Sequence, residues 1–245
     1  MPVGKDTPRQ RYRDHVRAEI KQAALRQIGD GGPASLSLNA IARELGVTGP
    51  ALYKYFAGRD ALLTELIMEG YESIAVAVRA EAARTAERPA RERLHALAAV
   101  YRKWAVDVPH LYQLLAGAPS PGYQAPIETV DSARAVLGPF LGVLARGSAR
   151  PAAGALEAEL RAWAESTPAV ADWVREYAPD ADPGPALAGA VTVWSRMHGV
   201  VSLEIQGQFG GMGHRGSTLL TSEIDALADA MGLPPGKPGP KGRPA

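Results

Sequence analysis

Apolar residues recur at intervals of three and four along most of this 245-residue chain. That spacing places them on one face of a helix, whereas a strand needs alternation of apolar and polar residues, which rarely persists here. The one ambiguous segment, 201–205, alternates like a strand. It lies within a longer helical spacing formed by Trp194, Met197, Val201, Ile205 and Phe209. The sequence therefore predicts an all-α fold.

Segments that contain glycine and proline interrupt this pattern and divide it into successive helices. The predicted helices cover about residues 16–28, 38–45, 48–56, 59–85, 90–108, 109–116, 124–146, 151–177, 186–208 and 217–231. Residues 234–245 are mainly Pro, Gly and basic residues, which is typical of a disordered tail.

The chain contains no cysteine, so it forms neither disulfides nor thiolate metal sites. Its longest apolar runs are far shorter than the ~18 residues that cross a membrane. Residues 1–17 are polar and lack the apolar core of a secretion signal. We therefore expect a cytoplasmic protein that does not bind membranes.

Positive charge is concentrated at the start of the chain. Residues 1–56 hold nine Lys/Arg against five Asp/Glu, whereas residues 57–245 hold 18 against 21. Such asymmetry indicates an anionic partner for the N-terminal part, with nucleic acid as the first candidate. A solvated basic segment without a partner is the alternative.

Residues 38–55 contain two short amphipathic helices joined by a three-residue segment that begins at Gly46. Ser37 is a suitable N-cap for the first helix, and Thr48 can cap the second, with Pro50 in its first turn. A connection this short favours the near-perpendicular crossing of a helix-turn-helix. In such a unit the first helix crosses the phosphate backbone, and the second enters the major groove of DNA.

The second of these helices carries the candidate DNA contacts. Its exposed candidates are Thr48, Ala51, Tyr53, Lys54 and Tyr55. Hydroxyl groups and a lysine ammonium suit contacts with phosphate oxygens or base edges. We expect Leu52 and Phe56 to turn inward.

The run 37–56, followed by 58–63, resembles the DNA-binding domain of TetR-family transcriptional regulators. Residues 52–56 read Leu-Tyr-Lys-Tyr-Phe and fill the family pattern of Leu-Tyr, a variable residue, an aromatic residue or His, and Phe. Tyr55 stands where His is commonest, and Arg59 stands where Lys is commonest. Both departures keep hydrogen-bonding or charged character.

This resemblance covers about residues 12–75 and implies a three-helix domain that binds double-stranded DNA. Residue by residue, it implies contacts from Ser37, Thr48, Ala51, Tyr53, Lys54, Tyr55 and Arg59. Because one helix-turn-helix makes few contacts, two copies are expected on a pseudo-palindromic operator. The family default is repression by occupying that operator.

A second resemblance lies downstream, in the segment Trp-Ser-Arg-Met-His-Gly at 194–199. It is similar to the Trp-x-x-x-His-Gly signature of WHG domains, a class of TetR-family C-terminal domains that bind ligands and form dimers. The resemblance implies a homodimer formed through 186–208 and 217–231. Gly199 would then permit a close approach between helices.

Large aromatic side chains are sparse in the rest of the chain, and each one singly is more often part of an ordinary core. Taken together, they could line an apolar pocket for a small effector. The candidate ligand-binding residues are Tyr101, Trp104, Tyr112, Trp163, Trp173, Trp194 and His198.

Two other motifs have simpler explanations. Residues 211–216 match Gly-x-Gly-x-x-Gly, but a dinucleotide site needs a preceding strand, so a flexible link between helices is favoured. Glu92 and His95 have the spacing of a carboxylate-bridged metal site, which would need a second copy that the sequence lacks. Without a nucleophile or cofactor motif, we expect no enzyme activity, cofactor or metal.

We predict a DNA-binding domain at 1–58, a ligand-binding and dimerisation domain at 59–233, and the tail at 234–245. The chain would be a repressor released from its operator by a small apolar effector, through a change carried by the helix at 59–85. Two alternatives remain. One is a helical ligand-binding or catalytic protein with a vestigial helix-turn-helix, and the other is an architectural DNA-binding protein without an effector.

Overall fold

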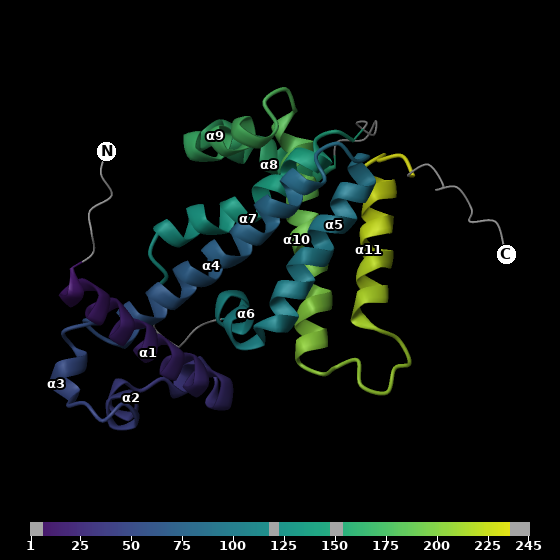
Figure 1. Ribbon diagram of the computed structural model, residues 1–245. Helices are drawn as coiled ribbons and strands as arrows, with labels where there is room; N and C mark the ends of the chain where they lie inside the picture. Colours follow the sequence, from purple (N-terminus) through teal and green to yellow (C-terminus); the bar gives the residue numbers. More distant parts are fainter. Residues whose placement is uncertain (1–6, 118–122, 148–153, 236–245) are drawn as a thin grey trace. The chain divides into compact units, whose positions relative to one another are not determined.

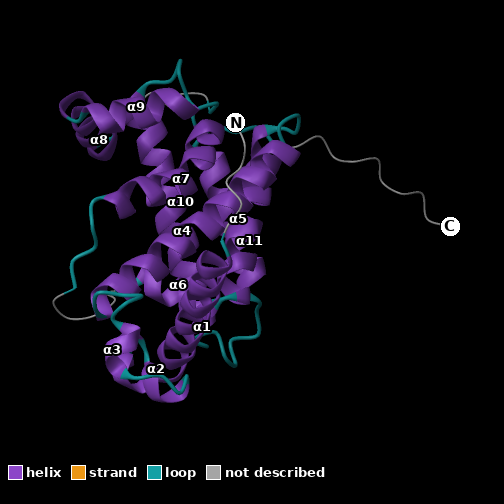
Figure 2. Cartoon of the chain, turned by 60° about the vertical axis from the view of Figure 1, so that its left-hand side comes forward, coloured by secondary structure: helices purple, strands orange, loops and turns teal. Residues whose placement is uncertain are grey.

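The computed structural model describes residues 7–117, 123–147 and 154–235. Across these residues it contains helices and no strand, which confirms the predicted all-α fold (Figure 1, Figure 2). The helices are α1 (Pro8–Gly31), the 3-10 helix η1 (Pro33–Ser35), α2 (Leu38–Glu44), α3 (Gly49–Leu52), α4 (Arg59–Arg84), α5 (Ala90–Asp107), α6 (Pro109–Ala116), α7 (Glu128–Leu144), α8 (Ala155–Ser166), α9 (Pro168–Tyr177), α10 (Pro183–Ile205) and α11 (Gly216–Ala230). No helix among the described residues is both long enough and apolar enough to span a membrane.

Helix α1 is longer than predicted. It begins at Pro8 rather than near residue 16, because Thr7 caps it: the Thr7 hydroxyl accepts a hydrogen bond from the Gln10 amide (3.2 Å). It ends as expected at the glycine cluster, where Gly32 has a φ of 74°, a conformation that favours glycine. The extension adds two exposed basic turns at the start of the helix.

The single helix predicted over 151–177 is wrong. The chain forms α8 and α9 there, because Thr167 is extended and Pro168 starts a new helix. A residue that precedes proline is driven out of the helical conformation by the proline ring. By contrast, 201–205 lies inside α10, so the helical interpretation of that ambiguous segment is confirmed.

The described chain divides into two compact units. The first comprises Met1–Tyr71 and Val108–Thr129, and the second comprises Glu72–Asp107 and Val130–Ala245. The first unit therefore contains α1, α2, α3, the first half of α4, and α6. This division differs from the predicted boundary at residue 58, because α6 and the start of α4 share a core with the helix-turn-helix.

That shared core joins every helix of the first unit. Its buried side chains are Ile20, Ala23, Ala24, Ile28, Leu36, Leu38, Ile41, Ala42, Leu52, Phe56, Leu62, Leu63, Leu66, Ile67 and Leu114. Glycines let α6 approach its neighbours closely. A Cβ atom on Gly70 of α4 would lie 2.6 Å from Leu115 Cδ1, and one on Gly29 of α1 would lie 3.0 Å from the His110 ring. Helix α6 is thus packed against both α1 and α4.

In the second unit, α10 is the central helix, with α8 and α11 packed along it. Its buried residues recur at helical spacing and include Leu187, Ala190, Val193, Met197 and Val201. Burying a side chain of this size contributes about 1.5–3 kcal/mol relative to leaving it exposed. Within the signature segment 194–199, Met197 therefore belongs to this core, whereas Trp194 faces away from it.

Candidate DNA-binding site

Local backbone chemistry builds the turn between α2 and α3. The Ser37 hydroxyl accepts a hydrogen bond from the Ala40 amide (3.3 Å) and caps α2, as predicted. Gly46 ends the helix with a φ of 67°, where a side chain would strain the backbone. Thr48 occupies the N-cap position of α3, but its side chain makes no capping hydrogen bond. The Thr48 hydroxyl therefore stays available to a ligand.

The recognition helix is short. Helix α3 spans only Gly49–Leu52, and the chain then continues as a tight turn in which the Tyr55 amide donates to the Leu52 carbonyl (2.9 Å). Leu52 and Phe56 are buried in the core, which confirms that they turn inward. A single helical turn does not hold its own conformation in water, so this segment depends on contacts from outside it.

Arg17 of α1 supplies one set of these contacts. Its guanidinium donates to the Tyr55 carbonyl and to the Glu65 carboxylate of α4. The same group lies over the Phe56 ring, 4.3 Å from the ring centre. Sequence reasoning missed Arg17, because nothing in local spacing links it to partners 38 and 48 residues away.

Arg59 makes a second long-range attachment, which reaches the chain before α2 rather than α3 itself. Its Nε donates to the Leu36 carbonyl (3.1 Å), and its Nη2 donates to the Pro33 carbonyl (2.7 Å). These bonds attach the start of α4 to the chain just before α2. Arg59 was predicted as a phosphate contact, and that role stays a prediction. The structure adds a positioning role, which uses two of the three guanidinium nitrogens as donors.

The other predicted contact residues fall into two groups. Thr48, Tyr53 and Lys54 are exposed, and Tyr53 is 53 % exposed although it is a large aromatic residue. Ala51 and Tyr55 are half-buried, and Tyr55 packs against the core. The first group offers two hydroxyls and an ammonium to a ligand, which is the chemistry of DNA contact.

Ion pairing decides which basic side chains remain for an anionic partner. Arg17 and Lys21 pair with Glu65, and Arg26 pairs with Glu44, all within this unit. The described cations of the first 56 residues that are exposed and form no ion pair are Arg9, Arg11, Arg13, Arg43 and Lys54. Three of them lie on the first two turns of α1, which the predicted contact set had left out.

The candidate effector residues lie on several helices of the described chain. Tyr112 is 2 % exposed and lies in the first unit, whereas the other six lie in the second. Two of the tryptophans point largely to solvent, Trp163 at 40 % exposure and Trp194 at 48 %. The Trp194 and His198 rings are neighbours, with centroids 6.2 Å apart. A ligand-binding role for this set stays a prediction.

The remaining predicted rings are held inside the second unit. Tyr101 is buried, and the indole N–H of Trp104 donates to the Ser73 hydroxyl (3.0 Å). Trp173 donates to the Arg134 carbonyl (3.1 Å) and lines an open cleft of about 550 Å³. Among the cavities described for residues 7–117, 123–147 and 154–235, this cleft of ligand size is lined by one of the predicted rings, Trp173.

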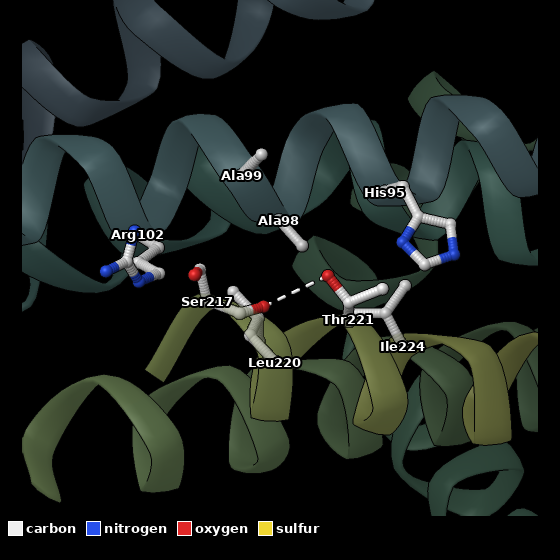
Figure 3. Close-up of a pocket in the computed structure, with 8 residues that line it drawn as sticks. All are labelled: His95, Ala98, Ala99, Arg102, Ser217, Leu220, Thr221 and Ile224. Atoms are coloured by element: carbon white, nitrogen blue, oxygen red, sulfur yellow. Dashed lines mark hydrogen bonds between the residues drawn. The ribbon is translucent and has the colours of Figure 1, made fainter. Parts of the chain in front are cut away.

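A second, smaller cavity of about 100 Å³ lies between α5 and α11 (Figure 3). His95 and Arg102 stand at its two ends, and the Thr221 hydroxyl between them donates to the Ser217 carbonyl (3.0 Å). Each basic group already has a carboxylate partner. His95 Nε2 lies 2.9 Å from Asp225, and Arg102 binds Glu204. His95 thus helps to join two helices and makes no pair with Glu92.

Comparisons with known proteins agree with this architecture. Residues 20–66 match the family model described as bacterial regulatory proteins, tetR family, and residues 94–227 match a tetracyclin repressor-like C-terminal domain. The HTH-type transcriptional regulator Rv1816 of Mycobacterium tuberculosis is 34 % identical over 211 residues, which cover 85 % of this chain and 87 % of that protein. The chain belongs to the TetR family.

Solved structures of TetR-family fold extend the comparison. The crystal structure of the regulatory protein SCO4313 has 43 % sequence identity and a TM-score of 0.74, covering 91 % of this chain and all of that one. FadR from Bacillus subtilis, solved in complex with stearoyl-CoA, has 15 % identity and a TM-score of 0.52 over 86 % of this chain and 96 % of that one, and so shares the fold alone. This protein is therefore a TetR-family transcriptional regulator rather than an enzyme.

Replacing Arg59 by Ala should destabilise the first unit, because the Leu36 and Pro33 carbonyls would lose charged donors. We expect the free energy of unfolding in urea to fall by about 1.5–3 kcal/mol. Arg59→Lys should recover less than half of this, since an ammonium cannot reproduce the fork of the guanidinium. Unchanged stability combined with weakened DNA binding would instead assign Arg59 to a phosphate.

Replacing Lys54 by Ala should weaken binding to all DNA sequences alike, because an exposed ammonium acts on the phosphate backbone. We expect the slope of log K against log salt concentration to decrease in magnitude by about one. Lys103→Ala, which removes an exposed lysine of the second unit, is the control and should change neither value. A loss confined to one base position would show that Lys54 reads sequence.

Proposed function

We propose that this TetR-family regulator is a repressor that occupies a pseudo-palindromic operator as a homodimer and is released by a small apolar effector. The observation that supports DNA recognition is the exposure of Thr48, Tyr53 and Lys54, of which the last two stand next to the residues that Arg17 of α1 contacts at the end of this segment. Since such a repressor acts on the chromosome, we also propose that it works in the cytoplasm.

Each predicted contact residue has a role in this proposal. The Thr48 hydroxyl, the Tyr53 ring and hydroxyl, and the Lys54 ammonium meet the DNA directly. Ala51 offers a methyl group to a thymine methyl in the major groove. Ser37 and Tyr55, together with Arg59, hold the two helices in the geometry that lets the others reach. The unpaired cations at the start of α1 add phosphate contacts without reading sequence.

The proposed dimer forms through 186–208 and 217–231. Helix α10 presents large apolar side chains to solvent, because Trp194 is 48 % and Leu203 is 43 % exposed. Gly199 lies between them, and a Cβ atom added there would meet nothing within 4 Å. A glycine inside a helix costs up to about 1 kcal/mol relative to alanine, and no neighbour within the chain accounts for it. The backbone of a second copy is the occupant that we propose.

The effector is proposed to bind in the second unit. The cleft beside Trp173 has a volume in the range of small-molecule sites and also presents Tyr177. FadR, which shares the fold, was solved with a ligand that carries a long apolar chain. To move the protein from almost fully bound to almost fully released, the effector needs roughly 5 kcal/mol of preference for the released state.

Replacing Gly199 by Leu should prevent dimerisation while the fold is kept, since the position is open within one chain. We expect light scattering at micromolar concentration to give the monomer mass for the variant and the dimer mass for the wild type. Ala80→Leu, at an exposed position of α4 in the second unit, is the control and should stay dimeric. A normal dimer of Gly199→Leu would place the interface elsewhere.

The effector is tested in two steps. Small apolar molecules are screened by quenching of tryptophan fluorescence, and ligands that bind are then tested for loss of binding to an operator selected from random DNA. Trp173→Ala should weaken both effects at least tenfold, whereas Trp163→Ala, which removes an exposed ring on α8, should leave both unchanged. A ligand that binds tightly without changing operator affinity would contradict the release mechanism. A protein that binds no DNA at all would instead favour a vestigial helix-turn-helix.

A further inference from the structure

Arg93, in the second unit, is a partly buried arginine with unpaired donors. Arg93 lies in the first turns of α5, and its Nε and Nη1 atoms are buried without any hydrogen-bond acceptor. Buried donors are almost always paired in folded proteins, because an unpaired donor loses its hydration without compensation. A guanidinium is more costly still, since it carries a full charge that does not titrate near neutral pH.

Other arginines of the same helix have carboxylate partners. Arg91, two residues earlier on α5, donates to both Asp225 and Asp229. Arg102, on the same helix, binds the Glu204 carboxylate through two nitrogens. The two other arginines of α5 therefore have carboxylate partners, whereas Arg93 has none among the described residues.

The surroundings of Arg93 make the missing acceptor more conspicuous. Arg146, in the turn that follows α7, is close enough for its positive charge to act on Arg93, and it forms no ion pair itself. Burial, and then this like charge, lower the pKa of the Arg93 guanidinium, while the Glu87 carboxylate opposes them without a hydrogen bond. The buried donors of Arg93 therefore stand beside a like charge, with one carboxylate that acts at a distance and no acceptor of the described chain in hydrogen-bond contact.

We propose that Arg93 and Arg146 bind an oxyanion group, a phosphate or a carboxylate carried by a small molecule. Two planar guanidinium groups offer paired N–H donors that match the oxygens of such a group, and burial of one donor set strengthens the interaction. The site belongs to α5 and the end of α7 and does not include the Trp173 cleft. The proposal of this anion site does not depend on the apolar effector proposed above.

The test is thermal unfolding of the full chain in sodium phosphate, sodium acetate and sodium chloride at equal pH and ionic strength. Phosphate or acetate should raise the Tm of the wild type over chloride by about 3–6 °C at ten times its dissociation constant. A larger rise in phosphate assigns the site to a phosphate monoester, and a larger rise in acetate assigns it to a carboxylate. Equal Tm values in all three salts would overturn the proposal.

Variants separate this site from general salt effects. Arg93→Met should abolish the anion-dependent rise and should also raise the Tm in chloride, because it removes an uncompensated buried charge. Arg146→Gln changes an exposed residue, so we expect this variant to fold normally. Its anion-dependent rise in Tm should be at most half of the wild-type rise. If either variant keeps the full response, the arginines are not the site.

Arg91→Met is the matched control. It removes a paired arginine from the same helix, so it should lower the Tm in every salt but keep the anion-dependent rise. Lys54→Ala should also keep the rise, which shows that the anion is not acting at the DNA-binding surface. If Arg93→Met instead lowered the Tm in chloride as much as Arg91→Met does, Arg93 would have an acceptor within the chain, and the proposal would fail.

Discussion

The attachment of Arg17 to the end of the recognition segment is the interaction on which the DNA-binding surface depends. Helix α3 has four residues, too few to be stable alone, and its geometry must come from its neighbours. The Arg17 guanidinium joins the Tyr55 carbonyl, the Phe56 ring and the Glu65 carboxylate in one cluster. Because Arg17 and these partners lie on three parts of the chain, namely α1, residues 55–56 and α4, displacing any one part disturbs the surface that carries Tyr53 and Lys54.

This cluster also explains how the positive charge near the N-terminus is divided. Part of the positive charge is paired within the fold, where Arg17, Lys21 and Arg26 form ion pairs with carboxylates of α4 and α2. The rest stays exposed at the start of α1, at Arg43 and at Lys54. A net count over the sequence cannot distinguish the two kinds of cation, whereas for a phosphate backbone only the second kind releases counterions.

Local chemistry was predictable from sequence, and long-range chemistry was not. The Ser37 cap, the stop at Gly46 and the inward turn of Leu52 follow from residue type and spacing within a few positions, and the structure has all three. The carbonyl partners of Arg59 and the docking of α6 depend on chain segments that meet only in the fold. The aromatic residues of the sequence likewise could not show that Trp163 points to solvent. Its helix has polar and small residues on most faces, so the sequence does not determine which face packs against the core.

The division into units restricts how an effector could act on DNA. The described chain passes between the units within α4, after Asp107 and after Thr129. Within the first unit, α3 is attached to α1 by Arg17, and the chain before α2 is attached to α4 by Arg59. A ligand in the second unit therefore cannot shift α3 alone without breaking charged hydrogen bonds, at about 1.5–3 kcal/mol each. A displacement of the whole first unit, transmitted through its three chain connections, breaks none of these hydrogen bonds. Under the proposed mechanism, release from the operator is thus a change in the placement of an intact helix-turn-helix. The effector must supply a preference of roughly 5 kcal/mol for the released state, and none of this free energy is needed to unfold the recognition segment.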